Sequence, residues 1–287
     1  MIVDGEQLKR IRKIVSKAIN KTAFELIIPS IVNNVNYALK PSSKESRSPG
    51  VKEDSLANRM KTVDMLERII FDAFMCLIYE WDPQNLMFDQ ENSKVLESCH
   101  QIGKANAERI LFPIPLLWRV PTKKNRRYDE AARYLKEFII KFIAEQKEVF
   151  RTKKEEVLLK KQRSLLQEML LANELEEDEE GRLSDDELVD QINFLLFAGF
   201  DTTSSVLSFA LDFLARNQEA QDKLRIEIWE AFPNGEEDIV KGGIEAIERL
   251  VYLRNVFEEV NRMRPLNPIY RDCIRDTEIN GYKIKKG

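Results

Sequence analysis

Residues 188–217, LVDQINFLLFAGFDTTSSVLSFALDFLARN, form the stretch that decides the fold. Apolar residues recur through it at helical spacing, which predicts a long and largely buried helix. Its centre nevertheless carries Gly199, Asp201 and Thr202. A glycine inside a helix costs roughly 1 kcal/mol relative to alanine, and an unpaired carboxylate among apolar groups costs more. These three residues therefore need an explanation beyond helix formation.

The residue types at the helix centre suggest a groove with a proton-transferring edge. Gly199 allows a close approach to the backbone. The Thr202 hydroxyl can bond to the carbonyl of Ala198, four residues earlier, which bends or widens a helix. A hydroxyl beside the Asp201 carboxyl can relay protons to a small ligand in the groove. An ordinary helix with one polar face explains the same residues equally well when they are considered alone.

A second motif follows about 60 residues later, in YLRNVFEEVNRMRP. Glu259 and Arg262 stand three residues apart and can face each other on one helix. If the pair is buried, the planar guanidinium can bind the carboxylate and backbone carbonyls together. If it is exposed, it is a surface ion pair of small energetic value. An ExxR motif by itself is weak evidence, because it is common by chance.

Composition limits the classes of function. The chain has 287 residues, and its 45 basic and 49 acidic side chains nearly balance, which gives no indication of a nucleic-acid partner. The three cysteines are far apart and the single histidine is His100, so a disulfide scaffold or a zinc site is not expected. The N-terminus lacks the apolar core of a signal peptide. The longest apolar run, INFLLFAGF, is about half of the roughly 20 residues that a membrane span needs, so we expect no crossing.

Helical periodicity dominates the chain, with about ten helical stretches expected and one clear hairpin. Leu8, Ile11, Val15 and Ile19 form a first apolar stripe. Further helices are expected over 21–38, 65–81 (buried), 125–173, 184–217, 218–232 and 244–264. Residues 40–55 are expected to form a surface loop and 174–183 an acidic connector, after which Ser184 and Glu187 form a capping-box pattern. The proline-rich segment 111–121 is not expected to be regular helix and exposes apolar surface unless something covers it. Asn280 and Gly281 predict a tight hairpin turn.

The order and spacing of these features resemble the cytochrome P450 family. The family has an (A/G)Gx(D/E)T motif in a long central helix, then ExxR, then an arginine and a Gly-containing hairpin, matched here by AGFDTT, Glu259–Arg262, Arg271 and DTEINGYKIKKG. Upstream, DGEQLKRIRKIVSKAI and LLWRVPTKKNRRYDEAARYLKEFI are also similar to family segments. The resemblance implies a mainly α, P450-like helical fold with a small β portion near the C-terminus, in one domain over residues 1–287.

The resemblance also implies roles for individual residues. Asp201 and Thr202 would deliver protons during oxygen activation, beside an oxygen groove formed by Ala198 and Gly199. Haem propionates would be bound by Arg12 and Arg271, and Glu259 and Arg262 would be structural parts of the core. The substrate pocket would be lined by Phe194, Phe197, Asn267, Pro268 and Ile269. Segment 111–121 would belong to a lid over the pocket, touching the membrane. The basic face of Lys9, Arg10, Lys13 and Lys17 would dock an acidic reductase or would simply be solvated.

The sequence departs from the family pattern in three places. Leu8 stands where the family usually has a tryptophan beside a propionate. The family's anchor helix and first strands would precede residue 1. Its haem-binding cysteine lies in an FxxGxRxC loop well after the hairpin, and Cys76, Cys99 and Cys273 have no such context, so no metal ligand is assigned among them or to His100. The sequence is therefore expected to be the middle part of a eukaryotic microsomal-type P450.

Two hypotheses about function remain open from the sequence. In the first, the chain is a fragment of a haem-thiolate monooxygenase that inserts oxygen into an apolar substrate, with electrons from an NADPH-cytochrome P450 reductase or a similar donor. The endoplasmic reticulum membrane is then the location typical of the family, with the plastid as an alternative. In the second, the chain is a non-catalytic helical interaction protein or a decayed P450 duplicate.

Overall fold

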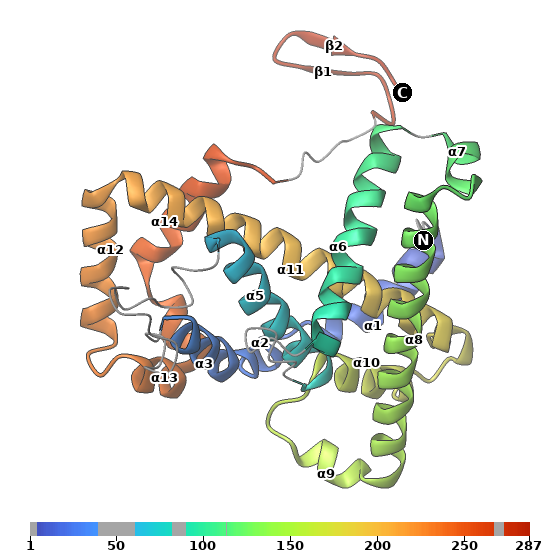
Figure 1. The fold of residues 1–287 in the computed structure, drawn as a ribbon, viewed down its shortest axis with the longest axis horizontal. Helices are drawn as coiled ribbons and strands as arrows, with labels where there is room; N and C mark the ends of the chain where they lie inside the picture. Colours follow the sequence, from blue (N-terminus) through green and yellow to red (C-terminus); the bar gives the residue numbers. More distant parts are fainter. Residues whose placement is uncertain (1–4, 40–60, 82–89, 113, 267–272) are drawn as a thin grey trace, which may run out of the picture.

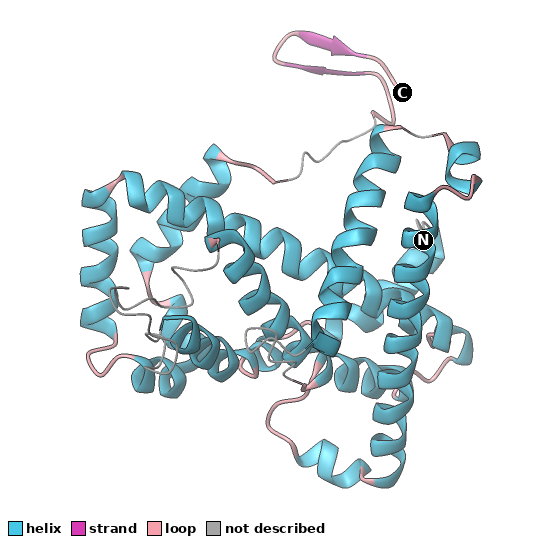
Figure 2. Ribbon diagram, viewed as in Figure 1, coloured by secondary structure: helices cyan, strands magenta, loops and turns pink. Residues whose placement is uncertain are grey.

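The chain is mainly α-helical, with a single small antiparallel hairpin in the part that is described. The computed structural model describes residues 5–39, 61–81, 90–112, 114–266 and 273–287 (Figure 1). The helices are α1 (Gly5–Ala18), α2 (Lys21–Phe24), α3 (Ile27–Leu39), α5 (Thr62–Tyr79), α6 (Gln90–Leu111), α7 (Pro115–Arg119), α8 (Lys123–Thr152), α9 (Lys154–Leu159), α10 (Leu165–Glu174), α11 (Asp185–Arg216), α12 (Gln218–Ala231), α13 (Glu236–Glu248) and α14 (Val251–Met263); the strands are β1 (Thr277–Ile279) and β2 (Tyr282–Ile284). The mainly α fold class with a small β portion is confirmed (Figure 2).

Helix α11 runs through the middle of the molecule and organises the rest (Figure 1). It begins at the predicted capping box: the Ser184 hydroxyl accepts from the Glu187 N–H, and the Glu187 carboxylate accepts from the Ser184 N–H. These bonds satisfy two backbone donors that a helix start leaves free. Helix α5 packs along α11, α8 contacts its N-terminal half, and α12 and α14 contact its C-terminal end. The fold therefore presents the central motif from a rigid helix.

The main core lies between α11 and the helices α1, α5, α6, α8 and α10. Helix α5 is buried over most of its surface, as its apolar sequence predicts, and Phe71 meets Phe200 of α11 edge to face, with ring centroids 5.4 Å apart. On α1 the buried residues are Ile11, Ile14 and Ala18, whereas Leu8 and Ile19 are partly exposed. The buried face of α1 is therefore centred on Ile14 and includes only Ile11 of the predicted stripe fully.

Several predicted helices are divided in the structure. The region 125–173 contains α8, α9 and α10, with Ser164 capping α10. The helix expected over 244–264 is divided at Leu250, whose extended backbone separates α13 from α14. Helix α13 also begins earlier than predicted, at Glu236, and bends at Gly243, where φ is +62°. Such divisions depend on contacts between distant segments, which helical periodicity does not record.

Segment 111–121 exposes apolar surface, as predicted. The segment was expected not to be regular helix, but Pro115 starts one short helix, α7, within it. At this position the missing proline N–H costs nothing. Exposed apolar side chains surround it: Ile110, Leu111, Phe112, Ile114, Leu116, Leu117 and Val120. Among them Leu116 is 74% exposed.

The C-terminal hairpin forms at the predicted dipeptide. Asn280 (φ +49°) and Gly281 (φ +83°) connect β1 and β2, with Ile279 paired to Tyr282 and Thr277 to Ile284. Both turn residues have positive φ, which two-residue hairpin turns require and which Asn-Gly adopts at low cost. The hairpin stands apart from the helical body in Figure 1.

The segment Glu179–Arg216, which contains α11, is long and apolar enough to cross a membrane by length and composition alone. The run INFLLFAGF alone is too short to cross, but apolar residues continue after Ser205. The core helix of a soluble protein can have the same length and composition. One such helix is therefore weak evidence that the chain crosses a membrane. Segment 40–55, predicted as a surface loop, lies outside the described residues.

Candidate functional site

One face of α11 carries most of the residues singled out by the sequence. Phe194, Ala198 and Asp201 are exposed along it, and Phe194 is 65% exposed. The Thr202 hydroxyl donates to the Ala198 carbonyl at 2.6 Å, which is the predicted back-bond. The spacing of these residues at three and four places them on one side of the helix. The helix thus presents an apolar strip with a carboxyl and a hydroxyl at its end.

Gly199 is turned away from that face and lies against α5. A Cβ built on Gly199 would stand 1.8 Å from Cε1 of Phe74. The close approach that its glycine predicts is therefore made by the Phe74 ring in this structure. Phe197, also predicted to line a pocket, is half-buried and packs near Phe200, with centroids 6.5 Å apart. Sequence spacing alone did not separate these inward residues from the exposed ones.

A cavity of about 370 Å³ lies between α1 and α11. Arg12, on α1, and Phe194, on α11, both line it, together with Leu8, Ile11, Val15, Ile19 and other residues of these two helices. Two residues that the sequence assigned to cofactor and substrate are thus brought to one space. Two carboxylates, Glu187 and Asp190, line the same space. The Arg12 cation beside apolar side chains would suit the carboxylate edge of a flat apolar group such as haem.

The basic face of α1 is mostly occupied by intramolecular pairs. Arg10 forms an ion pair with Glu187, and Lys13 Nζ lies 2.7 Å from a Glu176 oxygen. Burial opposes ionisation of Glu187, but hydrogen bonds from Arg10 and Ser184 outweigh it and lower its pKa. The four basic residues were expected to face a partner or solvent. Two of them instead join α1 to the acidic connector and to the start of α11.

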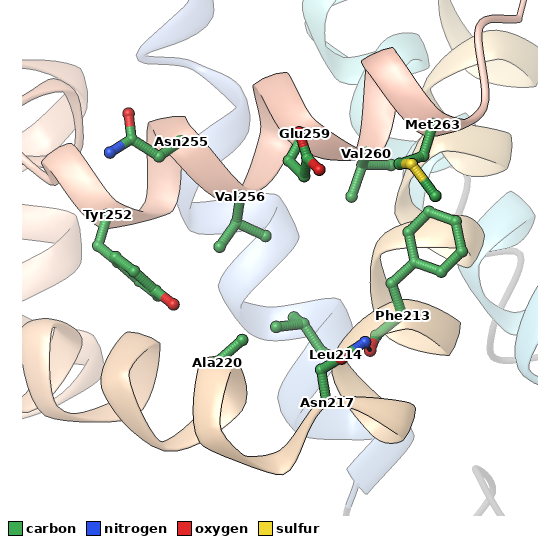
Figure 3. A pocket seen from close by; sticks show the side chains of 10 residues that line it. All are labelled: Phe213, Leu214, Asn217, Ala220, Tyr252, Asn255, Val256, Glu259, Val260 and Met263. Atoms are coloured by element: carbon green, nitrogen blue, oxygen red, sulfur yellow. Dashed lines mark hydrogen bonds between the residues drawn. The ribbon is translucent and has the colours of Figure 1, made fainter.

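The ExxR residues meet as predicted. Arg262 Nε lies 2.7 Å from Glu259 Oε2, and Arg262 Nη2 lies 2.6 Å from Oε1. The hydrogen bond from Arg262 lowers the pKa of Glu259. The side chains are 66% and 59% exposed, so the pair is a surface ion pair here and not part of a buried core as expected. Glu259 lines a cavity of about 440 Å³ between α11, α12 and α14. Figure 3 shows Tyr252 and Val256 of α14 directed into this space and Phe213 at one end.

Two carboxylates that the sequence did not single out bind backbone N–H groups of α14, beside that cavity, and of α13. Glu227 of α12 accepts from the backbone N–H groups of Tyr252 and Leu253 at 2.7 and 2.9 Å, and so caps α14. Glu25 accepts from the Ile244 N–H at 2.9 Å, just after the bend at Gly243. Carboxylates are favourable at helix starts because the first N–H groups lack partners there. No local signal identifies these caps, since each acceptor lies far along the chain from the N–H group that it binds.

The three cysteines lie apart from the face of α11 that carries the motif residues, and each is buried or bonded to a backbone carbonyl. Cys99 is buried, and burial raises the pKa of its thiol well above the usual range. Cys76 and Cys273 donate to the carbonyls of Leu26 and Arg275 at 3.7 and 3.0 Å. Arg271 and the segment 267–269 lie outside the described residues. Arg12 and the apolar side chains around it would suit the carboxylate edge and apolar body of a haem group, and none of the three thiols lines that cavity.

The chain belongs to the cytochrome P450 family, whose model matches residues 1–287. A stretch of 123 residues is 37% identical to cytochrome P450 3A31 of Mesocricetus auratus, covering 42% of this chain and 24% of that protein. Cytochrome P450 3A5 of Homo sapiens is 40% identical over 116 residues, which are 40% of this chain and 22% of that protein. The matched stretches are about a quarter of these relatives' length.

Solved structures agree on the fold. A cytochrome P450 named CYP102L1 superposes with a TM-score of 0.71 at 21% identity, covering 99% of this chain and 60% of that chain. The cytochrome P450DA haem domain gives a TM-score of 0.68 at 20% identity, covering 97% and 54%. The predicted P450-like helical fold is therefore confirmed.

Proposed function

We propose that this chain forms the oxygen-activating part of a haem-thiolate monooxygenase, as one domain over residues 1–287. The whole protein would insert one oxygen atom from O₂ into an apolar substrate, with electrons from an NADPH-cytochrome P450 reductase or a similar donor. The observation that carries the proposal is the exposed face of α11, where Phe194, Ala198 and Asp201 stand beside the back-bonded Thr202. Haem bound through a cysteine thiolate supplies the oxygen-cleaving chemistry.

Thr202 and Asp201 are proposed to move protons at this face. The Thr202 hydroxyl donates its hydrogen to the Ala198 carbonyl, so its oxygen still has lone pairs that can accept. To pass on a proton, the hydroxyl must turn away from that carbonyl. Asp201 is exposed one residue earlier and can return the proton. The back-bond thus holds Thr202 in place between turnovers.

Binding of the cofactor edge and the substrate is proposed for residues around the α1–α11 cavity. Arg12 would hold one propionate, with Arg271 as its partner for the second. Phe194 would close the apolar side toward the substrate, with Phe197 and residues 267–269 as further lining. Because none of the three thiols lines that cavity, the thiolate ligand is proposed to come from outside these 287 residues.

The surface of segment 111–121 supports a membrane-facing lid in the whole protein. Several large apolar side chains on and beside α7 are exposed, among them Leu116 and Leu117. Exposed apolar side chains in such numbers suit an apolar surface such as a lipid interface. We therefore propose location at a membrane of the endoplasmic reticulum, as relatives of the family suggest.

Replacement of Thr202 tests the proton role. In the haem-loaded protein that contains this segment, Thr202→Ala should direct reducing equivalents from product into peroxide. Thr203→Ala is the matched control. It removes the same groups from the neighbouring threonine, whose hydroxyl is not the one that donates to the Ala198 carbonyl. The amounts of NADPH consumed, product formed and peroxide released give the coupling efficiency of each variant. Unchanged coupling in Thr202→Ala would remove the proton role.

One observation favours the second candidate, a non-catalytic helical protein. Cys99 is buried with a raised thiol pKa, and Cys76 and Cys273, both partly buried, donate to backbone carbonyls, so none of the described thiols stands in an open site beside α11. If the chain acts without a cysteine from elsewhere, it would serve as an interaction module or as a decayed duplicate. A carbon monoxide difference spectrum of the natural protein separates the two: a red-shifted thiolate band supports the enzyme.

A further inference from the structure

Helix α7 is held in place by polar and aromatic contacts rather than by apolar burial. It lies beside the end of α6 and the start of α8 (Figure 1), and none of its residues is buried. Its leucines, Leu116 and Leu117, are exposed, so the hydrophobic effect contributes little to its position. The position of α7 therefore depends on specific contacts with the two helices beside it.

Arg109, in the last turn of α6, lies between an aromatic ring of α7 and one of α8. Its guanidinium carbon is 3.7 Å from the centre of the Tyr128 ring and 5.4 Å from that of Trp118. Both distances are within the roughly 6 Å over which a cation is attracted to an aromatic face. Tyr128 also packs against the main core, and Trp118 is the half-buried residue of α7. The contacts therefore lead from the core through Arg109 to α7.

A second contact holds the C-terminal end of α7. The side-chain amide of Asn125 donates to the carbonyls of Leu117 and Val120, at 2.9 and 2.7 Å. The end of a helix leaves such carbonyls without partners of their own. The first turn of α8 is also joined to α6 by the ion pair of Lys124 with Glu108. Helices α6 and α8 are thus connected without Arg109, whereas Arg109 is the cation that reaches the Trp118 ring.

We propose that Arg109 is a positioning residue that holds α7 closed against α8. When the guanidinium leaves the Trp118 ring, α7 turns outward about the bonds that Asn125 makes at its end. The inference rests on the proposed function, which makes α7 part of a lid over the substrate pocket. Arg109 then sets how often this lid opens, and so how readily an apolar substrate enters and leaves.

The Trp118 ring reports the position of α7 in the complete chain. Trp81→Phe and Trp229→Phe leave it as the single tryptophan. In that background, Arg109→Gln should shift the emission to longer wavelength and increase quenching by acrylamide, because the ring loses a neighbour that shields it. The population with α7 released should grow about two- to fivefold, which corresponds to the roughly 0.5–1 kcal/mol of an exposed cation–π contact. Arg109→Lys should restore part of the effect, since it keeps the charge and loses the planar group.

Variants of α8 separate the contact from a general effect of charge. Tyr128→Leu should release Trp118 as Arg109→Gln does, and combining the two should add little, because both break the same contact. Tyr128→Phe keeps the ring and should change nothing. Arg126→Gln removes an exposed cation of α8 and is the matched control. Equal emission in Arg109→Gln and Arg126→Gln, or full additivity of Arg109→Gln with Tyr128→Leu, would overturn the proposal.

Turnover of the haem-loaded protein that contains this segment tests the consequence for substrate. Arg109→Gln should raise the KM and leave kcat unchanged, because a lid that opens more often weakens substrate binding without altering the chemistry. Arg109→Lys should lie between this variant and the wild type. A released Trp118 with an unchanged KM would overturn the control of substrate access by Arg109. Unchanged coupling in Thr202→Ala would instead overturn the proposed function.

Discussion

Gly199 is the residue at which the central motif meets the core. Its missing side chain makes room for the Phe74 ring of α5, because a Cβ there would stand 1.8 Å from Cε1. The adjacent Ala198 and Thr202 belong to the exposed face. One short motif thus packs against α5 on one side of α11 and, in the proposed function, transfers protons on the other.

Gly199→Ala should destabilise the protein. Alanine gains roughly 1 kcal/mol of helix propensity over glycine, but the added methyl forces the Phe74 ring to move, which costs about 1–3 kcal/mol. We expect a net loss of about 1 kcal/mol in the free energy of unfolding, measured by urea denaturation. The double variant Gly199→Ala/Phe74→Leu should recover part of it. A single variant as stable as the wild type would show that the ring moves freely.

Glu187 is the residue through which pH acts on the contact between α1 and α11. Its pKa is lowered in the folded protein by Arg10 and Ser184, against the effect of burial. A lowered folded pKa contributes stability above the ordinary value of 4.5, and that stability is lost as the pH falls through the folded pKa. Wild type should therefore exceed Glu187→Gln in unfolding free energy near neutral pH, and the gap should shrink below about pH 4.5.

Paired denaturation curves at neutral and acid pH test this dependence. Glu245→Gln, at an exposed position of α13, is the control and should show little change. A gap between wild type and Glu187→Gln that stays constant with pH would contradict the assignment.

At the scale of elements, local signals predicted some features and remote contacts decided others. The capping box at Ser184, the Asn280-Gly281 turn and the Thr202 back-bond each lie within a few residues, and all three form. The break at Leu250 and the pairing of Lys13 with Glu176 depend on segments far apart in sequence. Charge and periodicity do not specify which distant residue meets them, so both were missed.

The cap that Glu227 places on α14 can be tested directly. Glu227→Ala removes the acceptor for two N–H groups, those of Tyr252 and Leu253, and should cost about 1–2 kcal/mol. Glu227→Gln keeps one acceptor oxygen and should cost less. Thermal unfolding measures both, with Glu230→Ala on the exposed side of α12 as the control. If Glu227→Ala unfolds at the temperature of that control, α14 begins independently of Glu227.

At the scale of the whole molecule, the helical body arranges one part of a site on α1 and α11. The family could be predicted because AGFDTT, ExxR and the hairpin occur in a fixed order. The residues proposed for the site lie on two helices: Arg12 and Phe194 line the α1–α11 cavity, Ala198 and Asp201 are exposed further along α11, and Gly199 turns inward. Glu259 and Arg262 were assigned to the core by resemblance, and the structure exposes them. Whether such residues are covered depends on neighbouring segments and not on the motif itself.

The last prediction concerns haem binding by this chain. Haem added to it should associate with the α1–α11 cavity, but its reduced carbon monoxide complex should lack the red-shifted thiolate band. The reason is that Cys99 is buried with a raised pKa, and Cys76 and Cys273 donate to carbonyls. A variant with Cys76→Ser, Cys99→Ala and Cys273→Ser should therefore give the same spectrum. Arg12→Gln should weaken haem binding, because the cation facing the propionate edge is lost. A thiolate band that disappears in the triple variant would show that one of these cysteines binds iron after all.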